Sequence, residues 1–392
     1  MRGMLLLMVV VQAGPLAAAT KPRARDLGVP FDGQPGALNA ITDVAGVEVG
    51  MVTLVRDEPR PDGKTAAVRT GVTAILPRGR AGSASPVFGG WFPLNGNGEM
   101  TGTHWIDESG FLEGPILITN THSVGVVRDA VVRWQVEHKL LYQDYSYPIV
   151  AETFDGGLND VNGFHVTADD ALRALEGARS GPVPEGNVGG GTGMICYEFK
   201  GGTGTASRRL RAEDGGYTVG ILVQANHGVR HQLEIAGVPF GRLYPDNAPF
   251  TKGRDLDNER GSIIIVVATD APLLPHQVRR LAKRAALGLA RTGGSAGNGS
   301  GDIFVAFSTA NPEAVQRKER LSSATFLQND ALTRVFRAVI LATEEAIVNA
   351  LVAAETMTGK DGLRVEGIPH DRLREAMKRS ARRSETAAPA VR

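Results

Sequence analysis

The chain has little of several features that commonly define a class of protein. Among its 392 residues there is a single cysteine, Cys196, so no disulfide can form within the chain. Its neighbours, GMICYEF, are mostly apolar, which favours a buried structural thiol over a reactive nucleophile. The formal net charge is only +1, from 43 basic and 42 acidic residues, so nothing indicates a nucleic-acid partner.

Long hydrophobic runs are also missing. Beyond the N-terminus no stretch reaches the roughly 18 uninterrupted apolar residues that a membrane helix needs, so the mature chain is expected to have no membrane partner. Residues 1–19 combine one arginine, a short apolar core and a final Ala17-Ala18-Ala19, the pattern of a secretory signal peptide. We therefore expect a periplasmic or secreted protein. The alternative is an apolar N-terminal extension that stays attached.

The rest of the chain is typical of one α/β domain. It is 42% hydrophobic and 22% charged, and it contains neither a linker nor an internal repeat. We assign residues 20–370 to one domain and 371–392 to a flexible, basic and Ala-rich tail. Strands are expected at 47–55, 71–76, 115–119, 148–152, 194–199, 217–224, 262–268 and 303–307, and helices at 124–138, 168–178, 275–291, 312–318 and 331–357.

One dipeptide, Gly261-Ser262, has two interpretations. A polar stretch ends in this pair and five β-branched residues follow at 263–267, so Ser262 opens a predicted buried strand. The first interpretation is an ordinary turn, for which Gly and Ser are common. The second is self-cleavage, in which the Ser262 hydroxyl attacks the Gly261 carbonyl. The free α-amine that this would release has a reference pKa of about 7.7 to 8.0, low enough to activate its own hydroxyl.

Three further patterns suggest chemistry but lack the required context. The run Gly293-Gly294-Ser295-Ala296-Gly297 fits a nucleophile elbow, yet the predicted helix precedes it and the strand follows, which is the reverse order. His227 and His231 have a spacing suited to zinc on a helix, but Gly228 between them favours a loop, so we expect no metal. The glycine-rich residues 188–206 match no phosphate-binding fingerprint, and a turn is the better interpretation.

Several motifs, in order, resemble the L-aminopeptidase/D-esterase family, which also contains the β-peptidyl aminopeptidases. They are RARDLGVPFDGQPGALNAITDVAGVEVG (23–50), NGNGEMTGTHW (95–105), VAETFDGGLND (150–160), VQANHG (223–228), GSIIIVVATDAPLLPHQ (261–277) and SGDIFVAFSTAN (300–311). The resemblance implies a four-layer αββα sandwich of the N-terminal-nucleophile-hydrolase type. It also implies self-cleavage into an α chain ending at Gly261 and a β chain from Ser262, and a homotetramer of such cleaved protomers.

The resemblance also assigns roles within a candidate site. Ser262 aligns with the nucleophile, and Ser300 and Asp302 align with the serine and acidic residue beside it; relatives have Glu where this chain has Asp302. Asn226 aligns with the oxyanion-stabilising amide, and Glu152 with the carboxylate that receives the substrate ammonium. The structural alternatives are a strand cap for Ser300 and Asp302, a turn for Asn226, and a solvent-facing strand end for Glu152.

Phe154 departs from the family pattern, because relatives carry a tyrosine there and a phenyl ring cannot donate its hydrogen bond. The implied substrates are short peptides, amino-acid amides or esters with a free amino terminus, and no cofactor is implied. Two other functions stay open. One is an acyltransferase resembling the ornithine acetyltransferases, although those use threonine as nucleophile. The other is a non-catalytic periplasmic peptide-binding relative.

Overall fold

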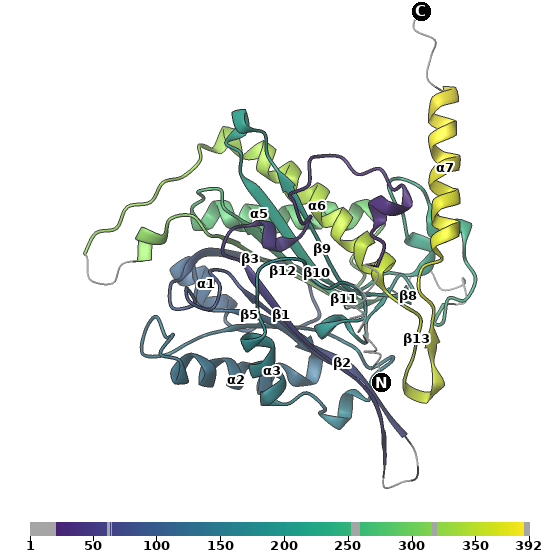
Figure 1. Cartoon of the computed structure of the whole chain (residues 1–392), viewed down its shortest axis with the longest axis horizontal. Coiled ribbons are helices and arrows are strands. Elements are labelled where there is room, and N and C mark those ends of the chain that lie inside the picture. Colours follow the sequence, from purple (N-terminus) through teal and green to yellow (C-terminus); the bar gives the residue numbers. More distant parts are fainter. Residues whose placement is uncertain (1–20, 61–62, 64, 252–258, 316–319, 388–392) are drawn as a thin grey trace, which may run out of the picture.

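The computed structural model describes residues 21–60, 63, 65–251, 259–315 and 320–387. The predicted signal peptide at 1–19 lies outside these residues. Two β-sheets pack face to face, and each has helices on its outer side, so the chain forms four layers in the order αββα (Figure 1). The α/β sandwich predicted from the sequence is therefore confirmed.

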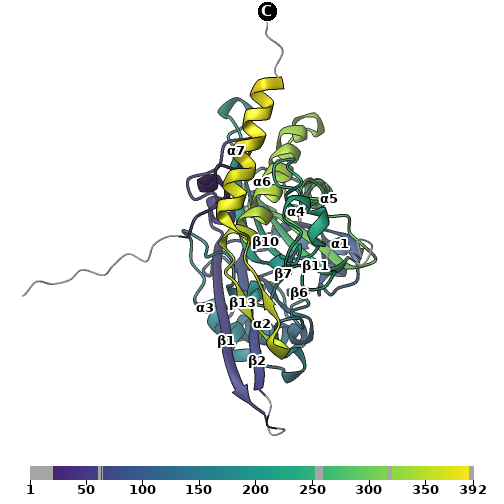
Figure 2. The same cartoon turned by 90° about the vertical axis from the view of Figure 1, so that its right-hand side faces the viewer.

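The smaller sheet has the strand order β1–β2–β5–β6, with only β5 and β6 parallel. Its strands are β1 (Glu48–Pro59), β2 (Thr65–Leu76), β5 (Ile116–Asn120) and β6 (Ile149–Thr153). Helices α2 (Val124–Glu137) and α3 (Ala168–Glu176) cover its outer face through a separate apolar cluster that includes the fully buried Trp134. β1 and β2 extend together beyond the body of the molecule in both views (Figures 1 and 2).

The larger sheet has the order β4–β3–β12–β11–β10–β9, with only β11 and β12 parallel. Its strands are β4 (Phe111–Leu112), β3 (Val87–Gly96), β12 (Gly299–Ser308), β11 (Arg260–Thr269), β10 (Thr218–Asn226) and β9 (Gly202–Arg209). Helices α5 (Pro275–Arg291) and α6 (Leu332–Ala353) cover its outer face.

The β-branched run of β11 explains its central position. Ile263 and Ile265 pack towards α5 and α6, whereas Ile264 and Val266 pack into the layer between the two sheets. A strand that is buried on both faces needs apolar residues at every position instead of at alternate ones, and this run supplies them. The expected strand was placed two residues too late, because β11 already begins at Arg260.

The prediction of a flexible C-terminal tail is wrong for residues 371–387. They belong to helix α7 (His370–Ala387), which projects from the body at the end opposite the β1–β2 hairpin (Figure 2). The rest of the predicted tail, residues 388–392, lies outside the described part. The first turns of α7 are held because Leu373, Ala376 and Met377 are buried at helical spacing in the core around α5 and α6. The basic composition suggested an exposed tail because it hid this narrow apolar stripe.

Smaller elements complete the chain and correct three other predictions. The expected strand at 194–199 is a tight hairpin of β7 (Ile195–Cys196) and β8 (Phe199–Lys200), and the glycine-rich 188–206 contains the start of β9. The helix expected at 312–318 is a 3₁₀ turn at Pro312–Val315, and residues 316–318 lie outside the described part. The remaining elements are α1 (Thr103–Ser109), α4 (Phe240–Leu243), β13 (Met357–Thr358) and β14 (Arg364–Val365).

Candidate active site

The Gly261–Ser262 peptide bond lies inside the β11 strand and not in a turn. Ser262 is paired in register with Asn226 of β10 and with Gly301 of β12. Gly261 has φ +132°, and a Cβ there would lie 1.9 Å from the Asn226 carbonyl oxygen. Only glycine fits this backbone conformation and this close approach, so the residue before the serine is fixed by geometry.

The hydroxyl of Ser262 is buried and lacks a hydrogen-bond partner among the described residues. The residue is 2% exposed. Strand alternation places its side chain on the face of Ile264 and Val266, towards the smaller sheet. An unsatisfied buried hydroxyl typically costs about 1 to 3 kcal/mol, so its presence beside a conformationally restricted glycine favours a chemical role over a structural one.

Ser300 and Asp302 lie on the neighbouring strand β12, where they pair in register with Gly261 and Ile263. Ser300 Oγ donates to Asp302 Oδ1 at 2.8 Å, and both residues are buried. Burial raises the pKa of Asp302 to about 6, with the nearby Glu259 carboxylate adding to the rise and the Ser300 hydrogen bond opposing it. The pair thus lies beside the backbone of the Gly261–Ser262 bond and makes no hydrogen bond to Ser262 Oγ.

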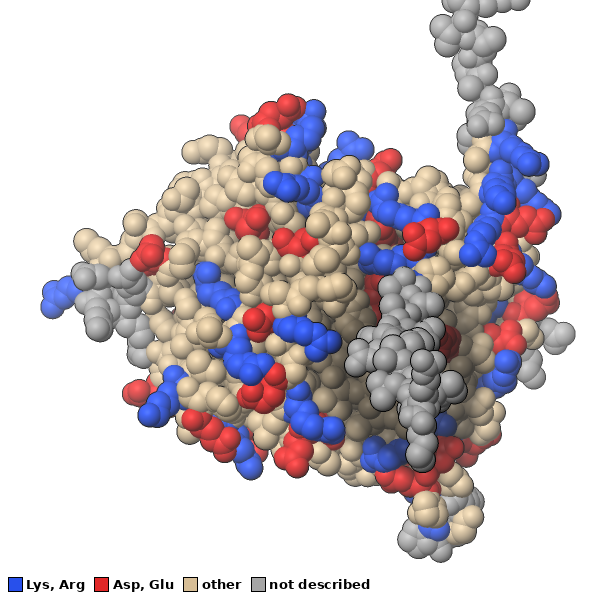
Figure 3. Space-filling model, in the orientation of Figure 1, with Lys and Arg blue, Asp and Glu red and all other residues tan. Residues whose placement is uncertain are grey.

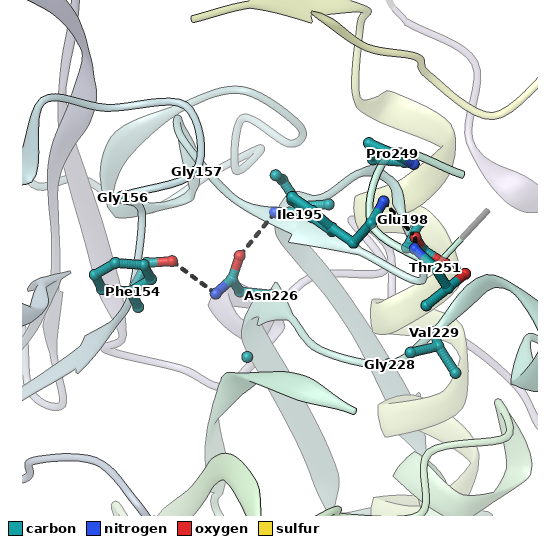
Figure 4. Close-up of a pocket in the computed structure, with 12 residues that line it drawn as sticks. Phe154, Gly156, Gly157, Ile195, Glu198, Asn226, Gly228, Val229, Pro249 and Thr251 are labelled. Atoms are coloured by element: carbon teal, nitrogen blue, oxygen red, sulfur yellow. Dashed lines mark hydrogen bonds between the residues drawn. The ribbon is translucent and has the colours of Figure 1, made fainter. Parts of the chain in front are cut away.

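Asn226 is the last residue of β10 and not a turn residue beyond it. Its Oδ1 accepts from the Ile195 amide at 2.8 Å, and its Nδ2 donates to the Phe154 carbonyl at 2.9 Å (Figure 4). These two bonds fix the orientation of the amide group, which carries a second N–H on Nδ2. Asn226 is the register partner of Ser262 on the neighbouring strand. A hydrogen-bond donor held rigidly beside Ser262 has the properties that an oxyanion-stabilising group requires.

Glu152 is buried near the C-terminal end of β6, which excludes a solvent-facing strand end. The residue is 4% exposed, and its carboxylate accepts from the Glu99 amide at 3.1 Å and from Thr121 Oγ1. Gly98 lies between Glu152 and Gly301, the register partner of Ser262 on β12. A Cβ on Gly98 would be 3.1 Å from Glu152 Oε1 and 3.5 Å from Cα of Gly301. Burial raises the pKa of Glu152, so the carboxylate would gain from a cationic ligand.

A pocket of about 510 Å³ adjoins Asn226 and Gly261. Its walls are mostly apolar, and Figure 4 shows the side chains that line it. Phe154 forms part of this wall and is 52% exposed, so the phenyl ring offers an apolar surface where the family pattern predicts a hydroxyl. The other apolar side chains are Ile195, Val229, Pro249 and Phe250.

The two histidines and the cysteine singled out in the sequence lie in different surroundings. His227 is buried against Tyr197, and burial lowers its pKa to about 3, whereas His231 is exposed on a 3₁₀ turn. Within the described ranges, no group of three or more His, Cys, Asp or Glu is arranged to hold a metal ion. Cys196 is fully buried, as expected, and burial raises the pKa of its thiol.

Two buried carboxylates near the site were missed by sequence reasoning. Glu198 accepts hydrogen bonds from the amides of Phe250, Thr251 and Arg230, and so holds one wall of the pocket. Glu259, two residues before Gly261, is 5% exposed and accepts from the loop at 295–297. Neither residue lies in a recognisable motif. The hydrogen-bond donors to each come from distant segments of the chain, so no local sequence pattern reveals them.

The distribution of surface charge and the hydrophobicity of the helices bear on whether the chain has other binding partners. On the face seen in Figure 3, acidic and basic side chains are interspersed without an extended patch of one sign. Among the described residues, no helix combines the length and the apolar character needed to cross a membrane.

Comparison with known proteins identifies the family. The model of peptidase family S58 matches residues 39–365. The chain is 55% identical over 375 residues to the β-peptidyl aminopeptidase BapA of Sphingosinicella microcystinivorans, a match that covers 93% of this chain and 94% of that protein. It is 49% identical over 385 residues to the enzyme of the same name from Sphingosinicella xenopeptidilytica, with 95% of each chain covered.

A solved structure gives the same result for the fold. The L-aminopeptidase D-Ala-esterase/amidase of Ochrobactrum anthropi, described as a prototype for the serine aminopeptidases and as a new variant among the Ntn hydrolase fold, superposes with a TM-score of 0.86 at 50% identity. The match covers 92% of this chain and 99% of that one. These similarities favour an aminopeptidase over an acyltransferase or a non-catalytic binding protein. The chain belongs to peptidase family S58 and is a serine aminopeptidase with the Ntn-hydrolase type of fold.

Proposed function

We propose that the chain cuts itself between Gly261 and Ser262 and then uses Ser262 as an N-terminal nucleophile. The observation that carries this is the buried Ser262 hydroxyl, which has no hydrogen-bond partner in the described part of the chain and directly follows a glycine that no other residue could replace. In the first step, Ser262 Oγ attacks the Gly261 carbonyl carbon, the C–N bond breaks, and the nitrogen gains a proton to become a free amine. Water then hydrolyses the ester, leaving a carboxylate on Gly261 and a hydroxyl on Ser262.

In turnover, the new amine takes the proton of the Ser262 hydroxyl as the hydroxyl attacks the substrate carbonyl. The amide of Asn226 stabilises the oxyanion, a contribution typically worth a factor of about 10² to 10³ in rate. Ser300 and Asp302, next in register to the cut bond, orient the amine and adjust its pKa. The acyl group leaves Ser262 when water attacks the ester.

Glu152 selects for substrates with a free amino terminus. Its carboxylate is buried and forms no salt bridge among the described residues, so a substrate ammonium would supply a directly paired positive charge. A blocked amino terminus would leave the buried charge unpaired, which is strongly unfavourable. This supports exopeptidase activity on short peptides, amides and esters.

The names of the two curated relatives support a β-amino acid at the substrate N-terminus. We therefore propose β-peptidyl aminopeptidase activity, with L-α substrates hydrolysed more slowly. Comparing kcat/KM for the p-nitroanilides of a β-amino acid and of the matching L-α-amino acid tests this preference. A higher value for the α compound would reject it.

The proposal extends to the location of the protein and to its assembly. The pattern of residues 1–19 supports export to the periplasm or beyond, which fractionation of an expressing cell tests. The resemblance to a family of oligomers supports a homotetramer of cleaved protomers. Light scattering coupled to gel filtration gives the mass and would reject the tetramer if it returned that of one protomer.

Intact mass under denaturing conditions tests the central proposal. The purified protein should give two chains, the smaller starting at Ser262, and Ser262→Ala should remain one chain. Ser308→Ala is a matched control, because Ser308 is equally buried on β12 but its hydroxyl donates to the Ala271 carbonyl at 2.6 Å. An uncut wild-type chain, or a cut Ser262→Ala chain, would refute self-cleavage by this serine.

A further inference from the structure

The loop at residues 293–297, whose sequence resembles a nucleophile elbow, is hydrogen-bonded to the segment just before the Gly261–Ser262 bond. Three donors converge on one carboxylate oxygen, Oε2 of Glu259, which lies two residues before Gly261. They are Ser295 Oγ at 2.6 Å, the Gly297 amide at 3.2 Å and Gln232 Nε2 at 3.4 Å. Glu259 is only 5% exposed, so these three hydrogen bonds are largely shielded from water.

The loop itself is fixed to the rest of the site. The Gly297 carbonyl accepts from Asn95 Nδ2 at 2.5 Å and from the Ser300 amide at 2.8 Å, which ties the loop to β3 and to β12. A Cβ on Gly297 would lie 2.8 Å from Cβ of Glu259. Glycine at this position is therefore required for the close approach of the loop to Glu259, and the elbow-like pattern has a packing explanation.

We propose that Glu259 and the loop Ser295–Gly297 form a clamp that positions the Gly261 carbonyl for attack by Ser262. This inference rests on the proposed self-cleavage. Attack needs the hydroxyl and the carbonyl carbon about 3 to 3.5 Å apart and correctly oriented. The C-terminal side of the bond is fixed by the pairing of Ser262 with β10 and β12. On the N-terminal side, the pairing with β10 ends at Ser262, while β12 still pairs with Gly261 and Arg260. Glu259 supplies a further anchor on this side.

The clamp explains how Gly261 keeps its left-handed backbone. Glycine is the most flexible residue, so its φ of +132° persists only if the chain is held on both sides. The pairing of β11 with β12 holds the backbone on both sides of Gly261, and the three hydrogen bonds to Glu259 add a restraint on the N-terminal side, where β10 no longer pairs. Glu259 is a positioning residue in this scheme, because it touches neither reacting atom.

The test measures the rate of self-cleavage directly. The full chain is synthesised in a cell-free reaction, sampled over time, denatured and analysed by intact mass. Glu259→Ala removes all three hydrogen bonds, and we expect cleavage to slow by about 10- to 100-fold, the effect of a small misplacement of reacting groups. Glu259→Gln should stay within about threefold of wild type, because the amide oxygen can take the place of Oε2 and accept the same bonds.

Controls separate positioning from stability and from charge. Glu234→Ala is matched, because Glu234 is adjacent to the loop but its carboxylate is 3.9 Å from Arg242 and half-exposed. It should cleave at the wild-type rate. In the uncut Ser262→Ala background, Glu259→Ala should lower the thermal midpoint by a few degrees, because buried donors lose their acceptor, and the variant should stay folded at the temperature of the cleavage assay. Should that variant fold poorly, Ser295→Ala removes one bond only and should still slow cleavage several-fold.

Three results would overturn the clamp: wild-type rates in both Glu259→Ala and Ser295→Ala, equal slowing by Glu259→Gln and Glu259→Ala, or equal slowing by Glu234→Ala. Rapid cleavage of the wild type in the same reaction shows that self-cleavage itself stands, so a failed clamp is distinguishable from a failed proposal. An uncut wild type would refute both.

Discussion

Replacing Glu152 with glutamine should abolish efficient turnover while leaving the fold at least as stable. Glutamine has nearly the same shape, and its amide oxygen can still accept from the Glu99 amide or from Thr121 Oγ1. What is lost is the negative charge that would receive the substrate ammonium. Removing one partner of a desolvated ion pair typically costs about 2 to 5 kcal/mol, so kcat/KM should fall on the order of 10²- to 10³-fold.

The stability side of this prediction follows from the pKa of Glu152. Burial raises it above the unfolded value, so the group stabilises the fold below its unfolded pKa, and this contribution is lost as pH rises through the folded pKa. Near pH 7.5 the buried charge is therefore unfavourable, and glutamine removes it. Glu152→Gln should unfold at the same or a higher temperature near neutral pH, with the difference disappearing towards pH 4.

The assay compares kcat/KM for a free-amine p-nitroanilide in wild type, Glu152→Gln and Glu99→Gln. Glu99 is the matched control, because it is an exposed carboxylate whose backbone amide contacts Glu152. Its substitution should change kcat/KM by less than about threefold. A similarly small loss in Glu152→Gln would refute the role of its carboxylate in binding the substrate ammonium. Thermal unfolding of both variants in the uncut Ser262→Ala background checks the stability prediction.

Two further substitutions test the scissile bond and its neighbour, both measured in the Ser262→Ala background so that every chain stays uncut. Gly261→Ala places a Cβ 1.9 Å from the Asn226 carbonyl oxygen at φ +132°, and should lower the free energy of unfolding by about 1 to 3 kcal/mol; an unchanged denaturation curve would contradict this. Asp302→Asn should remove a pH dependence of stability. Because the folded pKa of Asp302 is raised to about 6, its contribution is present below the unfolded pKa of about 3.9 and lost as pH rises through about 6. Denaturation at pH 5 and pH 7.5 should therefore differ less in the variant than in its parent, and an equal difference would show that Asp302 does not titrate there.

Much of the fold could be predicted from local pattern. The β-branched run after Ser262 predicted the central strand, and helix α5 has the bounds that its apolar spacing predicted. Strand β3 escaped notice, because its residues Val87–Gly96 include a proline and three glycines and carry no alternating pattern. Helix α7 was missed because its charge outweighed a stripe of three buried residues. In both cases packing partners elsewhere in the chain stabilise an element that its own residues specify weakly.

The candidate site, like the fold, was determined partly by the sequence and partly by the tertiary structure. Sequence alone determined which residues carry reactive groups and, through the family motifs, which of them belong together: Ser262, Asn226, Glu152, Ser300 and Asp302. It also determined that glycine precedes the serine. Only the tertiary structure decided that Gly261 is held at φ +132° against Asn226, that burial raises the pKa values of Glu152 and Asp302, and that an elbow-like loop holds Glu259. The physical reason is that desolvation and hydrogen-bond geometry depend on atoms from strands far apart in the chain, which no local pattern encodes.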